Sequence, residues 1–509
     1  MSTEAYQLTA IIIYMAAMLI IGWYSYRKTA NLTDYMLGGR SLGPAVTALS
    51  AGAADMSGWL LMGLPGAIYL SGMGEAWIAI GLSIGAYLNW LFVAPRLRVY
   101  TQVSSNSITI PSYLQSRLKD SSNLLRIASG LIILLFFTFY VSSGMVAGGV
   151  FFESSFGLDY HTGLLIVSAV VVAYTLFGGF LAVSYTDFLQ GLLMFLALIA
   201  IPVVGVFMTG GIGETVESIK SVNPSHLSLF AGTTTIGIIS TLAWGLGYFG
   251  QPHIIVRFMA ISSVKETKQA RRIGIGWMVL SLGGAIATAL VGVAYFVQNP
   301  DATLTSPEAV FIALGQVIFH PFIAGLMLAA VLAAIMSTIA SQLIVTSSAL
   351  VEDLYKAIIR TDAPDKTYVN LGRMAVLFVS IAAAILAWGE NDTILQLVSF
   401  AWAGFGASFG PVILLTLYWK KITSSGAVAG MVVGAVTVLV WETIDKFSVS
   451  LDGIFPDFVL LSIDSLYEIV PGFVLGLIAT VVVSLLTYKP NAEIEKEFDE
   501  TVRLLKRDR

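Results

Sequence analysis

Cysteine is absent from this chain of 509 residues, and histidine is scarce, with 4 in all. The first absence excludes disulfide bonds and thiolate metal sites. The histidines are not paired at the spacing of metal ligands, and none accompanies a nucleophile motif. A phosphate-binding loop and a dinucleotide-binding fingerprint are missing as well. The sequence therefore gives no basis for an enzyme or a resident cofactor, and the net charge of −4 gives no reason to expect nucleic acid as a partner.

Charged residues are also few, at 11%, whereas hydrophobic residues make up 57% and the mean hydropathy is +0.84. No water-soluble domain needs so apolar a chain, so we expect an all-α integral membrane protein. A spanning helix takes about 20 apolar residues. Thirteen stretches meet this requirement, centred near residues 16, 57, 85, 138, 170, 198, 241, 285, 335, 378, 405, 434 and 477. We expect one transmembrane domain over residues 1–488 and a polar tail over 489–509.

The loops between these stretches differ in charge. If the thirteen helices alternate in direction, every Lys and Arg except Lys220 and Lys446 falls on one side, Arg257 included, and acidic residues dominate the other side. Basic loops remain cytoplasmic. The N-terminus is therefore expected outside and the C-terminus, with its tail, in the cytoplasm; an even number of helices would contradict this distribution.

Two of the apolar stretches are interrupted by polar residues and glycine: SAGAADMSGW in helix 2 and WGLGYFGQP in helix 7. Five helices separate them, and an odd offset reverses direction in the membrane. Two five-helix units that each start with a broken helix would be inverted repeats, with a binding site near the bilayer midplane. The alternative is that glycine and serine only allow close helix contacts.

Asp55 lies inside the first of these segments, and the nearest basic residues in the sequence are Arg40 and Arg96. A charged carboxylate at a helix centre costs about 3 kcal/mol, so a bound cation or a proton is expected to offset it. A neutral Asp55 that hydrogen-bonds to a neighbouring helix is the alternative. Residues before a helix break present free carbonyls, and Ala53 and Met56 are the candidates for coordinating a cation.

Helix 9 contains LAAIMSTIASQ, in which Ala334, Ser337, Thr338 and Ser341 follow the spacing i, i+3, i+4 and i+7. This spacing places them on one helix face. Two hydroxyls and a carbonyl from that face would complete an oxygen site for a hard cation such as sodium. The alternative is that the hydroxyls bond to carbonyls of their own helix.

Aromatic residues accompany the helix 7 interruption. Trp244 and Tyr248 are four positions apart, so their rings lie on one face. Beside a break, such rings can hold a small amphipathic solute by apolar contact and by cation–π attraction to an amine. Tyr140 and Trp59 are further candidates, and plain packing is the alternative for all four.

Five stretches of the chain resemble the solute:sodium symporter family, and the likeness extends over essentially its whole length. They are LTDYMLGGRSLGPAVTALSAGAADMSGWLLMGLPG, YTLFGGFLAVSYTDFLQ, WGLGYFGQPHIIVRFMA, LAAIMSTIASQ and SFAWAGFGASFGP. The segment SAGAADMSGWLLMGLPGA is similar to the proline-transporting branch. The resemblance implies thirteen transmembrane helices and a fold of the leucine-transporter type, with helices 2–6 and 7–11 as inverted repeats over about residues 43–210 and 231–418.

The resemblance also implies roles for individual residues. It implies a sodium site formed by Ala53, Met56, Ala334, Ser337 and Thr338, with Asp55 nearby and important for sodium dependence. It implies a proline pocket formed by Ser57, Gly58, Trp59, Tyr140, Trp244, Tyr248 and Pro252, and a coupling or gating role for Arg40 and Asp187 on the cytoplasmic side. Some relatives hold a second sodium with the helix 6 acid and two more helix 9 hydroxyls. Here Asp187 and Ser341 are present but Ala340 lacks a hydroxyl, so one sodium per substrate is expected.

The function expected from this resemblance is symport of sodium and L-proline into a bacterial cell across the cytoplasmic membrane. The bilayer, sodium and L-proline are the expected partners, and the sequence does not indicate an oligomeric state. A sodium symporter for another small amino acid or a carboxylate is the first alternative. A passive cation channel is the second, and the scarcity of charges inside the helices argues against it.

Overall fold

The computed structural model describes residues 2–27, 31–359, 364–389, 393–447 and 466–507. Over these ranges the chain is helical, with one isolated bridge between Leu42 and Ile261 and no strand. Ten helices among the described residues are long and apolar enough to cross a membrane. The expected helices near residues 57, 170 and 241 fall outside that group because each is short or interrupted.

The first half of the chain runs from the N-terminus to the end of the expected helix 6. Its helices are α1 (Thr3–Tyr26), α2 (Leu32–Leu37), η1 (Gly38–Arg40), α3 (Pro44–Asp55), η2 (Trp59–Gly63), α4 (Leu64–Ser71), η3 (Met73–Glu75), α5 (Ala76–Leu88), η4 (Asn89–Val93), α6 (Ala94–Val103), α7 (Ile110–Leu118), α8 (Leu124–Phe156) and α9 (Tyr160–Met208).

The second half contains the remaining helices. These are α10 (Ile212–Val222), η5 (Pro224–Leu227), α11 (Thr235–Leu242), η6 (Ala243–Gly250), α12 (Pro252–Ala260), α13 (Thr267–Gln298), η7 (Pro307–Ala309), α14 (Val310–Ile318), α15 (Pro321–Ser348), η8 (Ala349–Tyr355), α16 (Lys356–Ile358), α17 (Asp365–Leu386), α18 (Ile394–Tyr418), α19 (Ser424–Phe447), α21 (Ile469–Thr487) and α22 (Ala492–Arg507).

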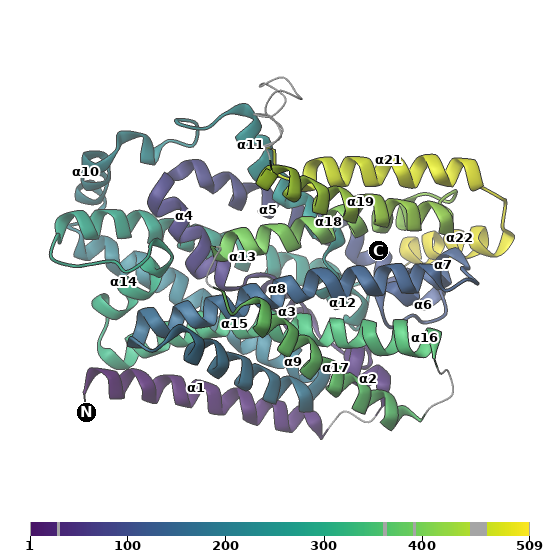
Figure 1. Ribbon diagram of the computed structural model, residues 1–509, viewed down its shortest axis with the longest axis horizontal. Coiled ribbons are helices and arrows are strands. Elements are labelled where there is room, and N and C mark those ends of the chain that lie inside the picture. Colours follow the sequence, from purple (N-terminus) through teal and green to yellow (C-terminus); the bar gives the residue numbers. More distant parts are fainter. Residues whose placement is uncertain (1, 28–30, 360–363, 390–392, 448–465, 508–509) are drawn as a thin grey trace.

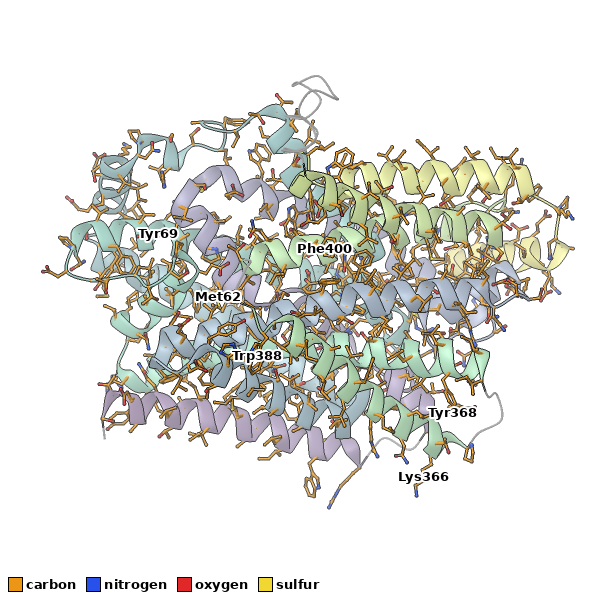
Figure 2. The ribbon with its side chains drawn as sticks, viewed as in Figure 1. Met62, Tyr69, Lys366, Tyr368, Trp388 and Phe400 are labelled. Carbon is orange, nitrogen blue, oxygen red and sulfur yellow. The ribbon has the colours of Figure 1, made fainter. Side chains whose placement is uncertain are left out.

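The long helices lie side by side in one bundle, so the molecule has two distinct ends (Figure 1). The connecting helices α10 and α14 lie at one end, and α7, α16 and α22 lie at the other. Figure 2 shows Tyr69 toward the first end and Lys366 at the second. Helix α15 is the centre of the bundle because it is buried along almost its whole length and packs against α9, α1 and α8.

Both expected helix breaks are present. Helix α3 ends at Asp55, Met56 has a non-helical backbone with ψ 81°, and the chain resumes as a π-helix at Trp59. The second break follows η6, a 3-10 helix, and lies at Gln251, whose backbone is extended with ψ 105°. Pro252 then starts α12, where its missing N–H is tolerated at the first helical position.

A third interruption separates the expected helices 5 and 6 within α9. Gly179 has φ 61° and ψ −161°, a backbone conformation that residues other than glycine rarely adopt. The ring of Tyr35 lies so close that a Cβ at this position would come within 2.7 Å of it. Glycine is required here by the backbone and by the close packing.

Candidate functional site

The carbonyl of Ala53 is released from its helical hydrogen bond by the break after α3. In a continuous helix the N–H of Ser57 would donate to it, but that N–H donates to Asp55 O at 3.0 Å instead. Two hydroxyls of α15 take its place: Ser337 donates to Ala53 O at 2.7 Å and Thr338 at 3.3 Å. Ser337 also reaches Ala334 O at 3.1 Å. Four of the five expected sodium ligands therefore meet within hydrogen-bonding distance.

Met56 is the fifth expected ligand and lies at the break itself. The N–H of Leu60, which would bond to Met56 O in a continuous helix, donates to Ser57 O at 3.0 Å. Met56 is fully buried. Its carbonyl is thus freed by the same distortion that frees Ala53, and a buried carbonyl without a helical donor is suited to a hard cation.

Asp55 is buried and faces helix η6. Its Oδ2 accepts a hydrogen bond from the hydroxyl of Tyr248, while Oδ1 has no hydrogen-bond partner among the described residues. The Trp59 indole donates to its backbone carbonyl at 3.1 Å. The hydrogen bond to a neighbouring helix is therefore present, and because the Tyr248 hydroxyl donates it, the bond does not require a neutral Asp55. A cation held by Ala53 and Met56 would feel the Asp55 charge from one or two residues away.

Aromatic side chains pack together beside Asp55, and we call Trp59, Trp244, Tyr248, Trp402 and Tyr467 the aromatic cluster. Ring centroids lie 6.4 Å apart for Trp59 and Trp244, and 5.3 Å apart for the stacked pair Trp244 and Tyr467. Trp402 packs edge-on against Tyr248 at 5.1 Å and donates to Trp244 O at 2.8 Å. Three of the expected pocket residues are thus in one cluster with two residues that the sequence did not single out.

The other expected pocket residues differ in their surroundings. Tyr140 and Pro252 are both buried, but Pro252 lines a separate small cavity together with residues of α7 and η8. The Tyr140 hydroxyl has no hydrogen-bond partner among the described residues. The Ser57 hydroxyl accepts from Trp59 N at 3.3 Å. Gly58 lies against α8 and α15, where a Cβ would come within 2.9 Å of Ala147. An unpaired buried hydroxyl such as that of Tyr140 is a candidate partner for a polar ligand.

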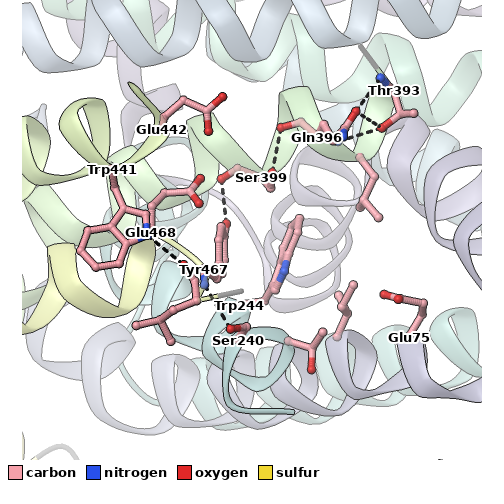
Figure 3. Close-up of a pocket in the computed structure, with 14 residues that line it drawn as sticks. Glu75, Ser240, Trp244, Thr393, Gln396, Ser399, Trp441, Glu442, Tyr467 and Glu468 are labelled. Carbon is pink, nitrogen blue, oxygen red and sulfur yellow. Dashed lines mark hydrogen bonds between the residues drawn. The ribbon is translucent and has the colours of Figure 1, made fainter. Parts of the chain in front are cut away.

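Trp244 and Tyr467 also line a cavity of about 360 Å³, which Figure 3 shows. Its lining also includes Glu75, Glu442 and Glu468. We call it the outer cavity. A second cavity, of about 20 Å³, lies next to Asp55 and Tyr248 and has room for a single water. Trp244 and Tyr467 of the aromatic cluster thus line the outer cavity, and Tyr248 lines the small one.

Arg40 lies away from this site, at the end of the bundle that holds α7. Its guanidinium donates to Met259 O at 2.7 Å, to Ser107 O at 2.6 Å and to Thr101 Oγ1 at 3.1 Å. Burial lowers the pKa of Arg40 to about 10, and the nearby charge of Arg98 acts in the same direction. Arg40 is therefore still charged at neutral pH and ties the end of α12 to the segment that follows α6.

Asp187 forms a buried ion pair with Arg257, and both side chains have an exposed fraction of 0%. The charge pattern counts Arg257 with the cytoplasmic loop charges, but in the structure Arg257 lies in a buried helix and not in a loop. Arg257 lies in α12, whose apolar residues are all buried, so its charge is directed into the bundle toward Asp187 at 3.1 Å. The sequence offered one signal, a lone Arg in the apolar run HIIVRFMA.

Sequence comparison places this geometry in a known family. The sodium:solute symporter family matches residues 35–434, and the chain is 62% identical over 483 residues to the high-affinity proline transporter PutP of Bacillus subtilis. The chain belongs to the sodium:solute symporter family. The PutP alignment covers 95% of this chain and 98% of the relative.

Two further relatives in the family carry related names. The osmoregulated proline transporter OpuE of Bacillus subtilis is 53% identical, with 97% of this chain and 98% of the relative covered. The sodium/proline symporter of Staphylococcus aureus is 52% identical, with 96% and 94% covered.

Among solved structures, a sodium-coupled sialic acid symporter in an outward-open state shares the fold with a TM-score of 0.78 at 20% identity, covering 95% of this chain and 98% of the other. The nucleobase-cation symporter Mhp1 in a closed conformation matches with a TM-score of 0.52 at 12% identity, covering 92% and 99%. These likenesses establish a multi-pass membrane protein with the fold of sodium-coupled symporters.

Proposed function

We propose that this protein imports L-proline together with sodium across the cytoplasmic membrane of a bacterium. The observation that carries the proposal is the Ala53 carbonyl, which lacks its helical donor and meets the Ser337 and Thr338 hydroxyls of α15. Family membership makes sodium the expected cation, and the names of the three relatives above make L-proline the expected solute.

We infer that thirteen helices cross the membrane. The ten long helices supply ten of them, and the interrupted segments α3–α4, the first part of α9, and α11–α12 supply the rest. The two breaks then start two inverted repeats, over about residues 43–210 and 231–418. The N-terminus would lie outside and the tail 489–509 in the cytoplasm.

The mechanism follows from the position of the break. Sodium bound to Ala53, Met56, Ala334, Ser337 and Thr338 would fix the end of α3 and, through it, Asp55 and Trp59 of the solute pocket. If sodium raises the affinity for the solute, the solute must raise the affinity for sodium by the same factor. One inward-moving charge contributes about 2.3 kcal/mol for each 100 mV of membrane potential, which can drive uptake of a zwitterion.

The solute would reach its pocket through the outer cavity. Trp244 and Tyr467 line that cavity, and Trp244 stacks on Trp402. Trp402 in turn packs against Tyr248, the hydrogen-bond partner of Asp55. These rings have to separate for the solute to enter and close again behind it, as alternating access requires. A passive channel would need a continuous polar pore, whereas aromatic rings line this path, so the aromatic cluster favours a carrier.

Uptake into proteoliposomes tests the proposal. An inward sodium gradient is expected to concentrate labelled L-proline inside, whereas an equal potassium gradient is not. Competition by a panel of unlabelled amino acids and carboxylates separates proline from other solutes. Equal accumulation in sodium and in potassium would rule out sodium coupling.

A further inference from the structure

The Arg257 guanidinium is enclosed by oxygen atoms from four helices. It lies 3.1 Å from Asp187 Oδ2 of α9, 2.6 Å from Ser341 Oγ of α15, 3.1 Å from Ser50 Oγ of α3 and 2.5 Å from His253 O of its own helix α12. The two hydroxyls also bond to the carboxylate, Ser50 at 2.7 Å and Ser341 at 3.3 Å. One carboxylate, two hydroxyls and a carbonyl are oxygen ligands suited to a hard cation.

This oxygen cluster lies beside the proposed sodium site. Ser341 follows Ser337 by four residues on α15, and Ser50 precedes Ala53 by three residues on α3. Each pair is therefore separated by one helical turn along the same face. Helices α3 and α15 therefore supply oxygens both to the proposed sodium site and to the oxygen cluster around Arg257, which we call the second cluster.

The second cluster is fully buried, so the charge of its carboxylate has to be compensated by a cation nearby. Asp187, Arg257, Ser50 and Ser341 are all inaccessible to solvent, and Asp187 Oδ1 has no hydrogen-bond partner among the described residues. Removing one partner of such a pair leaves an uncompensated charge and is strongly unfavourable. Without Arg257, the Asp187 carboxylate would therefore attract another cation into the space between two hydroxyls.

We propose that Arg257 is a tethered cation that occupies a second cation site and so holds the number of transported sodium ions at one per solute. The inference rests on the proposed sodium symport. Because the Arg257 guanidinium already neutralises the Asp187 carboxylate, no second sodium ion is needed there. Arg257 would thus limit the number of sodium ions by filling the site, in addition to any role of Ala340.

The first measurement uses the unmodified protein. The reversal potential of solute flux in proteoliposomes, measured with fixed sodium and solute gradients, is expected to give one sodium per L-proline. A ratio of two would overturn the inference while leaving sodium symport intact. Absence of any sodium-driven accumulation would instead overturn the proposed function.

The second measurement counts sodium sites directly by equilibrium binding of ²²Na⁺ to purified protein. Arg257→Gln is expected to bind two sodium ions per protein where the unmodified protein binds one. Arg257→Lys, which keeps a cation on the same helix, is the matched control and is expected to bind one. Asp187→Asn added to Arg257→Gln removes the carboxylate and is expected to return the number to one.

Two results would overturn the assignment. One is a single sodium ion bound by folded Arg257→Gln, and the other is two ions bound by the Asp187→Asn, Arg257→Gln double variant. If Arg257→Gln fails to fold, Arg257→Met, which keeps a long side chain without the charge, takes its place in the count with the same two expected numbers. A reversal potential that gives two sodium ions per solute in the unmodified protein overturns the inference in either case.

Discussion

Many serine and threonine hydroxyls inside the helices of this molecule donate to a carbonyl of their own helix, as Ser168 does to Leu164 and Thr346 to Gln342. Thr338 differs, because its hydroxyl donates to the carbonyl of Ala53 on another helix. Ser337 does both. A hydroxyl that donates its proton to a freed carbonyl still has its lone pairs available for a cation. No backbone carbonyl of its own helix loses a helical hydrogen bond as a result.

Substitution of these two residues therefore tests the sodium site at the level of single atoms. Ser337→Ala and Thr338→Ala are each expected to raise the sodium concentration for half-maximal uptake about 10- to 100-fold, because a bond to a charged partner contributes about 1.5–3 kcal/mol. Thr346→Ala removes a hydroxyl of the same helix that bonds only within it. A sodium dependence that shifts equally in all three variants would contradict the site.

Asp120 provides a second test at the residue scale, outside the membrane-spanning segments. Its carboxylate accepts from Leu125 N at 2.9 Å and from Ser122 N at 3.0 Å, so it caps the start of α8, whose N-cap residue Asn123 makes no side-chain cap bond. Burial alone would raise the pKa of Asp120, but the hydrogen bonds from Ser122 and Leu125 outweigh it and lower the pKa below its ordinary value.

The lowered pKa fixes the sign of a pH effect. A carboxyl whose pKa is depressed in the folded state stabilises that state above its ordinary pKa of about 3.9, and this stabilisation is lost as the pH falls further. Asp120→Asn leaves one acceptor oxygen where the carboxylate uses two, so it is expected to lower the free energy of unfolding by about 1 kcal/mol at pH 7. In thermal unfolding followed by tryptophan fluorescence, the gap between variant and unmodified protein should close below about pH 4; a constant gap would contradict the assignment.

At the scale of elements, α5 and η6 approach each other closely through glycine. A Cβ on Gly85 would lie 2.1 Å from Gly245 O, and one on Gly245 would lie 2.3 Å from Gly81 O. This contact brings η6, which contains Trp244 and Tyr248, against α5. The aromatic cluster is therefore positioned by a backbone contact that has no room for a side chain.

Gly85→Ala is expected to separate α5 from η6, lowering the melting temperature and weakening solute binding, because the obstructing atoms are backbone atoms that cannot move aside. Gly276→Ala is the matched control, since a Cβ on Gly276 in α13 meets nothing within 4 Å. That variant is expected to be unchanged or more stable by up to about 1 kcal/mol. Thermal unfolding in detergent compares the two, and equal losses would contradict the explanation.

Some features of these helices can be predicted from the sequence, and others cannot. The breaks of helices 2 and 7 can be predicted because Asp55 and Pro252 stand beside glycine in apolar runs, where a charge is costly and a proline does not continue a helix. The face of Ser337 and Thr338 follows from helical spacing alone. The hydrogen-bond partner of Asp55 cannot be predicted from helical spacing, because Tyr248 lies 193 residues away and carries no charge. The Asp187–Arg257 pair and the contact of Trp402 with Tyr248 likewise depend on which helices the fold brings together.

At the scale of the whole molecule, the C-terminal helix α22 is held to one end of the bundle by ion pairs. At the end that holds α22, Lys119 pairs with Glu493 and Glu497 of that helix. Lys420 pairs with Asp499 there at 2.6 Å. The tail is thus a helix packed on the bundle and not a frayed end. Lys220, in contrast, lies in α10 at the opposite end.

The absence of native cysteine allows this orientation to be measured with single introduced thiols. Thr3, Ser221 and Ala492 are exposed, and the first two are expected outside while Ala492 is expected in the cytoplasm. In intact cells, a membrane-impermeant maleimide should label Thr3→Cys and Ser221→Cys and should label Ala492→Cys only after permeabilisation. Because an odd number of spans puts the ends of the chain on opposite sides, labelling of Thr3→Cys and Ala492→Cys from the same side would contradict the thirteen-helix count. Labelling of Ala492→Cys alone in intact cells would instead keep an odd count and reverse the orientation.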